Sequence, residues 1–158
     1  LWGFIDASGN VVVESQYDSG ERFSDGLAPT EKDELSGYID LNGNVVVPLQ
    51  YDSTTYVYSG RAWVKQNGAY HMIDKAGKQV GDAEWQNVFA DFGWAELCRV
   101  NRNGLWGYVN AENEPVLDAV YEKATRFSDG LAAVKKDGAW YLIDESGVDV
   151  LSGENTQA

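Results

Sequence analysis

Cys98 and His71 are the only cysteine and the only histidine of the chain, and so the only two side chains that could form a thiol nucleophile and its base. Such a dyad needs a base within hydrogen-bond reach and a third group that orients it. Cys98 instead stands in a strand position that holds alanine elsewhere in the chain, which predicts a buried, inert thiol. One cysteine and one histidine also argue against a transition-metal site.

Carboxylates are the most abundant reactive groups, because 25 Asp and Glu against 12 Lys and Arg give a formal net charge of −13. So many carboxylates place some pair close together, as in a glycosidase. Most of the recurring aspartates, however, precede a glycine by three residues, as in Asp6 and Gly9, which predicts turn caps. These turns lack the dense oxygen ligands of a calcium loop. We therefore expect no enzyme activity and no catalytic, metal-binding or cofactor-binding residue.

Repeated aromatic residues are the remaining candidates for ligand binding. They occupy equivalent positions, two residues before another large apolar side chain: Trp2, Tyr70, Trp106 and Trp140. If exposed, these rings could stack on sugars or receive a peptide. If they pack against a second aromatic set (Tyr17, Tyr51, Trp85 and Tyr121), they form a second core layer, which the stacking of repeats favours. Ser36 interrupts the row in the second unit.

These positions belong to an internal repeat with a period of about 34 residues. The hexapeptide that begins at Phe23 returns unchanged at Phe127, and one turn position recurs at intervals of 34, 34, 36 and 34 residues: Asp6, Asp40, Asp74, Asn110 and Asp144. The two extra residues are most simply placed between Asp91 and Leu97. We therefore interpret residues 1–151 as one domain, followed by a polar tail at 152–158. Its units are approximately 1–26, 27–60, 61–94, 95–130 and 131–151.

The local pattern of each unit is typical of β-structure. Short runs rich in Val, Ile, Trp and Tyr are separated by Asp-Gly and Asp-x-x-Gly turns, whereas no 3.6-residue periodicity survives. We expect an all-β fold, a tandem array of three-stranded antiparallel meanders in an open, solenoid-like arrangement. A propeller-like ring is the alternative. The open array is favoured because the first unit lacks its first strand and the tail offers none to close a ring.

Two aliphatic sets are predicted to form the core. One precedes each turn (Ile5, Ile39, Ile73, Val109 and Ile143), and the other is the third residue after the turn glycine or Asn113 (Val12, Val46, Val80, Val116 and Val150). A fully buried side chain of this size contributes about 1.5–3 kcal/mol before entropy is counted. No unit can bury such a face alone, so neighbouring units must stack.

The motif at Leu1-Trp2-Gly3-Phe4-Ile5-Asp6, repeated at Leu105-Trp106-Gly107-Tyr108-Val109-Asn110, resembles the WG (or KWG) repeat of bacterial proteins. The resemblance covers residues 1 to about 151. The chain departs from the Trp-Gly motif in three units, which have Ser36-Gly37, Tyr70-His71 and Trp140-Tyr141 instead. The resemblance implies a bacterial, non-catalytic repeat module, often part of a larger protein, and it transfers no catalytic residue.

The leading functional hypothesis is a module for protein binding or scaffolding, a segment of a larger bacterial protein. Carbohydrate or cell-wall binding through the repeated Trp and Tyr is the alternative. Residues 137–147 are locally similar to choline- and glucan-binding repeats, although their much shorter period argues against membership. The acidity argues against nucleic-acid partners, and no apolar run approaches the roughly 20 residues of a membrane span. Nothing in the sequence indicates a compartment.

Overall fold

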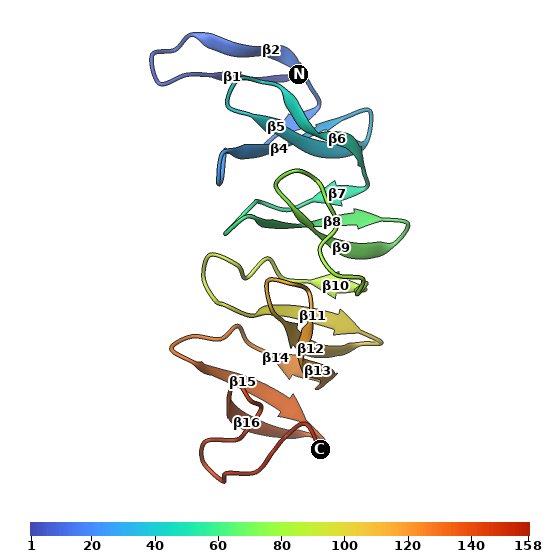
Figure 1. The fold of residues 1–158 in the computed structure, drawn as a ribbon, viewed down its shortest axis with the longest axis vertical. Coiled ribbons are helices and arrows are strands. Elements are labelled where there is room, and N and C mark those ends of the chain that lie inside the picture. Colours follow the sequence, from blue (N-terminus) through green and yellow to red (C-terminus); the bar gives the residue numbers. More distant parts are fainter. The chain divides into compact units, whose positions relative to one another are not determined.

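The structure is a computed structural model that describes residues 1–158 as 16 short strands with no α-helix (Figure 1). All pairings are antiparallel, and no sheet is closed. The all-β tandem arrangement expected from the sequence is thereby confirmed. No helical segment is present that could cross a membrane.

The strands form five separate sheets, in chain order. The first contains β1 (Trp2–Ile5) and β2 (Val11–Tyr17). The second contains β3 (Ser19–Gly20), β4 (Leu27–Lys32), β5 (Leu35–Asp40) and β6 (Val45–Tyr51). The third contains β7 (Ser53–Thr54), β8 (Arg61–Gln66) and β9 (Ala69–Asp74). The fourth contains β10 (Asn87–Val88), β11 (Cys98–Arg102), β12 (Leu105–Val109) and β13 (Pro115–Tyr121), and the fifth β14 (Lys123–Ala124), β15 (Leu131–Lys136) and β16 (Ala139–Asp144).

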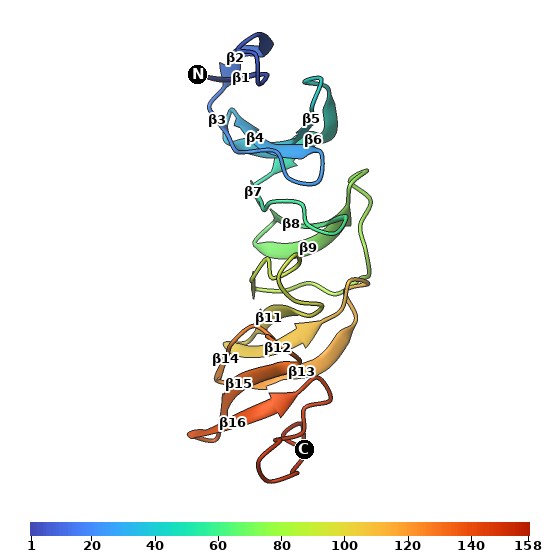
Figure 2. The ribbon, with the colours of Figure 1, turned by 90° about the vertical axis from the view of Figure 1, so that its left-hand side faces the viewer.

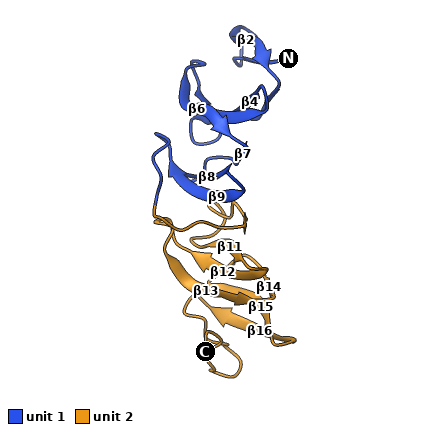
Figure 3. Cartoon of the chain, turned by 90° about the vertical axis from the view of Figure 1, so that its right-hand side faces the viewer, with its two compact units in different colours: residues 1–80 blue, residues 81–158 orange.

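The chain divides into two compact units, unit 1 from Leu1 to Val80 and unit 2 from Gly81 to Ala158 (Figure 3). Unit 1 holds the first three sheets, and unit 2 holds the last two. Each unit thus contains more than one repeat and has its own hydrophobic clusters.

The turns explain why the strands begin and end where they do. In the hairpin between β8 and β9, Asn67 and Gly68 both have positive φ values, 52° and 80°. Two such residues in sequence match the right-handed twist of the strands they join. In the wider turn after β5, Asp40 Oδ1 accepts hydrogen bonds from the backbone N–H groups of Asn42 and Asn44, each at 2.9 Å.

The sheets differ from plain three-stranded meanders in two respects. The connection between repeats adds a two-residue strand beside the first long strand, as β14 does beside β15 (Figure 2). In addition, the third long strand is missing from the β7–β8–β9 and β14–β15–β16 sheets.

The second residue of the Trp-Gly motif explains where the third strand forms. A Cβ on Gly3, Gly37 or Gly107 would come within 2.5 Å of a backbone carbonyl oxygen of that strand. Only glycine therefore lets β2, β6 and β13 approach. His71 and Tyr141 occupy the same position in the two sheets that lack the strand. A side chain at this position thus coincides with loss of the pairing.

The first of the two predicted core sets is confirmed in four of its five positions. Ile39, Ile73, Val109 and Ile143 are buried. Ile39 packs with Val13 and Tyr17 of the preceding repeat. Ile5 is exposed because within residues 1–158 no repeat precedes it to cover that face.

The second core set was assigned wrongly. Val12, Val46, Val116 and Val150 are 37–45% exposed, and Val80 is half-buried. The next residue is buried instead in three repeats, as Val13, Val47 and Leu117. The cause is a bulge, because Val109 pairs with Pro115 whereas Tyr108 pairs with Leu117, and Val116 is the extra residue. A one-residue shift moves every later side chain to the opposite face.

Candidate functional site

The four repeated aromatic positions do not share one environment. Trp2 and Trp140 are exposed, whereas Tyr70 and Trp106 are half-buried. Trp2 lies directly opposite Tyr17 on the neighbouring strand, and Trp106 lies opposite Tyr121. The Trp106 ring also lies 5.1 Å from that of Phe89, measured between centroids. The row is therefore part core layer and part open surface, and its role in ligand binding stays a prediction.

The second aromatic set is buried throughout, in Tyr17, Tyr51, Trp85 and Tyr121. The Tyr108 ring makes an edge-on contact with Tyr121, with 6.4 Å between centroids. The Tyr108 hydroxyl donates to the carbonyl oxygen of Thr125 at 2.7 Å. Burial raises the pKa of Tyr108 well above its ordinary value. These side chains form the interior layer between successive repeats.

Cys98 fills the small buried slot, as predicted. It is fully buried and pairs with Val109, just as Ala28 pairs with Ile39 in an earlier repeat. His71 belongs to unit 1 and Cys98 to unit 2. A fully buried thiol lacks the solvent exposure of a reactive cysteine.

The repeated aspartates act as turn caps. Asp144 Oδ1 accepts from the backbone N–H of Ser146 at 2.9 Å and of Val148 at 3.1 Å, beside Gly147 with a φ of 80°. A hydrogen bond from the Ser146 hydroxyl is the main cause that lowers the pKa of Asp144. No group of three or more His, Cys, Asp or Glu side chains is arranged to hold a metal ion.

The two-residue insertion forms a loop in unit 2. Its position was predicted from the sequence, but the ion pair that anchors it was not. The backbone N–H groups of Trp94 and Ala95 both donate to the carbonyl oxygen of Asp91, which forms a turn. The carboxylate of Asp91 receives two hydrogen bonds from the guanidinium of Arg99, at 2.8 and 2.9 Å. Both side chains are largely buried. This paired contact anchors the loop to β11.

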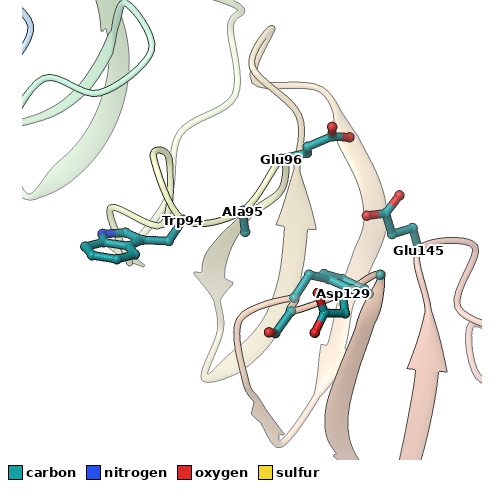
Figure 4. A pocket seen from close by; sticks show the side chains of 8 residues that line it. Trp94, Ala95, Glu96, Asp129 and Glu145 are labelled. Carbon is teal, nitrogen blue, oxygen red and sulfur yellow. The ribbon is translucent and has the colours of Figure 1, made fainter.

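A hollow of about 360 Å³ lies beside this loop (Figure 4). Three of its lining residues are acidic, Glu96, Asp129 and Glu145, and they come from three separate segments. The ring of Trp94 points away from these carboxylates in Figure 4 and is 68% exposed. Arg126 lies over that ring, 5.5 Å from its centroid. The surface around the insertion thus combines negative charge with one exposed indole.

A second hollow, of about 170 Å³, lies in unit 1 between the second and third repeats. Its lining is Tyr51, Val64, Gln66, His71, Ile73, Gly77 and Gln79. Sequence reasoning missed this hollow. The available signal was His71 in place of the motif glycine, since a side chain there displaces the third strand.

The tail at 152–158 is ordered on unit 2. The hydroxyl groups of Thr156 and Tyr121 lie 2.8 Å apart and share a hydrogen bond. Thr156 is buried, and the side chain of Gln157 donates to the Tyr121 hydroxyl at 2.8 Å. The polar composition of the tail gave no signal for this packing.

Three segments of the chain, residues 2–35, 37–70 and 106–140, match the family described as WG containing repeat. The chain belongs to this family. The matches leave out residues 71–105, which hold the His71 substitution and the two-residue insertion. No curated protein matches the chain. Family membership identifies the chain as a WG-repeat module. The close approach of the bulged third strand explains why the second residue of the motif is glycine.

Proposed function

We propose that this WG-repeat chain is a non-catalytic module that binds a protein partner. The observation that carries the proposal is the exposure of three indoles, since Trp2, Trp94 and Trp140 are 59%, 68% and 57% exposed. Tryptophan is enriched among the residues that dominate binding energy at protein interfaces. Large apolar groups left in water are otherwise unfavourable.

The charge of the chain indicates the kind of partner. A net charge of −13 favours a partner with a basic surface, because opposite potentials accelerate encounter. The acidic lining beside Trp94 agrees with this choice, since Glu96, Asp129 and Glu145 surround the hollow there. A basic partner would use its charges for approach and an apolar group for the indole.

The proposal is tested by affinity capture with the purified full chain, mass-spectrometric identification of bound proteins, and titration of the recovered partner. Trp94→Ser and Trp140→Ser should each weaken binding at least tenfold if the indole is a hot spot. Leu105→Ser, an exposed aliphatic position at a hairpin, is the matched control and should have little effect. Binding should also weaken as salt increases. Capture of no partner, together with turnover of any substrate in a broad panel, would contradict the proposal.

Carbohydrate binding is the second candidate, and the exposure of Trp2 and Trp140 favours it. An exposed indole presents the flat apolar face on which a sugar ring stacks. A glycan array probed with the full chain distinguishes the two functions. Binding to a defined glycan that Trp140→Ser abolishes would support carbohydrate recognition, whereas an empty array would remove it.

A further inference from the structure

The C-terminal segment occupies a specific place against the last repeat of unit 2. The backbone N–H of Thr156 donates to the carbonyl oxygen of Gly147 at 2.9 Å, and the Thr156 hydroxyl donates to the same oxygen at 2.7 Å. Its hydroxyl also meets Tyr121, and its carbonyl accepts from the Lys136 ammonium group at 2.7 Å. Asn155 forms a β-bridge with Val148. The segment is therefore held by one β-bridge at Asn155 followed by a turn at Thr156 and Gln157.

The hollow of unit 1 is the same place two repeats earlier. Each of its lining residues has a counterpart 70 positions later in the sequence: Tyr121, Val134, Lys136, Tyr141, Ile143, Gly147 and Asp149. In unit 2 the chain's own segment packs on this place and leaves a hollow of about 160 Å³ beside Lys136 and Tyr141. In unit 1 the place is a hollow of about 170 Å³.

The backbone that frames the two places is also the same. Val80 donates to the carbonyl oxygen of Met72 at 2.8 Å, as Val150 does to that of Leu142. Ile73 bridges Gln79, and Ile143 bridges Asp149. The likeness therefore includes backbone geometry as well as residue type, and it ends where the chain continues from Val80 into the next unit.

The hollow of unit 1 presents polar groups that correspond to those on which Thr156 binds in unit 2. Tyr51 is only 7% exposed and lines the hollow, at the position where Tyr121 meets Thr156 in unit 2. By analogy with Tyr121 and Thr156, this hydroxyl can share a hydrogen bond with a hydroxyl of a ligand in the hollow. The carbonyl of Gly77 corresponds to the one that Thr156 uses on Gly147.

The differences between the two places limit what the ligand must contain. Gln66 stands in place of Lys136, so an amide replaces the ammonium group, and this amide donates to the carbonyl oxygen of Gln50 at 3.5 Å. Pro48 stands in place of Asp118, whose backbone N–H donates to the side chain of Gln157 at 2.6 Å. Because proline has no N–H, the glutamine contact has no counterpart in unit 1. A ligand residue with a hydroxyl group, equivalent to Thr156, is therefore the feature that the two places would recognise in common.

We propose that the hollow of unit 1 binds a short, hydroxyl-bearing segment of the partner protein. A Thr or Ser hydroxyl of that segment lies on Tyr51, and its backbone N–H donates to the carbonyl of Gly77, as Thr156 does in unit 2. This inference rests on the proposed protein-binding function and names the recognition element.

The test uses a blocked hexapeptide with the sequence of residues 153–158, titrated into the isotope-labelled full chain and followed by NMR chemical shifts. We expect saturable shifts at Tyr51, His71 and Gly77. Replacement of the peptide threonine by valine should weaken binding about fivefold to tenfold, the effect of one lost hydrogen bond. Tyr51→Phe should weaken it by the same factor. Tyr17→Phe, at the equivalent buried position of the first repeat, should leave the affinity unchanged, and the spectra themselves report that each variant is folded.

Shifts confined to Tyr121 and Gly147 would show exchange with the chain's own tail and overturn the proposal. So would the absence of binding, or binding that is indifferent to Tyr51→Phe. None of these results bears on partner capture by Trp2, Trp94 or Trp140, which lie outside the hollow. Failure of this inference is therefore distinguishable from failure of the proposed function.

Discussion

The backbone of Gly107 lies so close to the carbonyl oxygen of Leu117 that a Cβ on Gly107 would be 2.5 Å from that oxygen. Gly37 has the same relationship with Val47. The glycine of the WG motif is therefore required by the approach of the bulged third strand rather than by an unusual φ angle. The motif glycine allows β12 and β13 to pack closely. In the two repeats where the glycine is replaced, the third strand is missing from the sheet.

Gly107→Ala should accordingly destabilise the chain by about 3 kcal/mol or more, since a methyl group forced against backbone displaces the strand. Gly104→Ala is the matched control, because it lies in the same hairpin with positive φ and nothing within 4 Å of its Cβ. That variant should cost only about 1 kcal/mol of backbone strain. Urea unfolding measures both values, and equal losses would contradict the packing explanation.

The Asp91–Arg99 pair should be the most sensitive electrostatic contact. Asp91→Asn leaves a largely buried guanidinium without its charge partner and should cost about 3–5 kcal/mol. Lys75→Gln removes a partner from the exposed pair with Asp25 and should cost at most about 1 kcal/mol. Denaturant unfolding compares the two variants. A loss at Asp91 no larger than at Lys75 would show that the pair does not anchor the insertion loop.

The turn aspartates predict a specific acid sensitivity. Hydrogen bonds from Asn10, Asn44 and Ser146, respectively, are the main causes that lower the pKa of Asp6, Asp40 and Asp144 in the folded chain. Because the folded pKa lies below the unfolded one, the stabilisation is present above the unfolded value of about 4. It is lost as pH falls through the folded value.

Replacement of all three aspartates by asparagine should therefore make the acid loss of stability shallower, as measured by urea midpoints between about pH 5 and about pH 2. Asn110 already occupies this position in the fourth repeat, where its side-chain oxygen accepts from the N–H of Glu112 and Glu114. The natural asparagine shows that the turn tolerates the change. An unchanged acid profile in the triple variant would refute the link.

Two buried tyrosines predict the behaviour at high pH. Burial raises the pKa of Tyr38 and of Tyr108 well above the ordinary value. A raised folded pKa stabilises the folded state below the unfolded pKa, and the contribution is lost as pH rises from about 10 toward the folded value. Tyr38→Phe and Tyr108→Phe should lose less stability between about pH 8 and about pH 11 than the parent chain. Thermal melts at the two pH values provide the measurement, and identical losses would contradict the prediction.

The sequence located the turns correctly because their chemistry is local. Asp40 and Gly43 determine the turn through hydrogen bonds within five residues and one positive φ angle. The burial of Ile39 and Ile143 was also predicted correctly, because the residue before the turn faces the same side of the sheet in each of these repeats. Cys98 was recognisable as core from its alanine counterparts.

The error at Val46 and Val116 has a physical cause that the alternation of residues could not reveal. The bulge after the turn inserts one residue and reverses the faces of the strand, so Val47 and Leu117 enter the core instead. The substitutions at His71 and Tyr141 were visible in the sequence. Their consequence, the missing third strand, depends on a backbone approach that only coordinates supply.

The repeat period, the strand class and the family were determined by the sequence alone, because each rests on short-range patterns that recur five times. Only the tertiary structure showed which valines of the third strand are buried, and that Asp91 pairs with Arg99. It also showed that the hydroxyl of Thr156 shares a hydrogen bond with that of Tyr121. Those outcomes depend on contacts between residues distant in the chain or on slips of strand register. A local sequence pattern determines neither the long-range contacts nor the strand register, because their free energy depends on which residues the folded chain places next to each other.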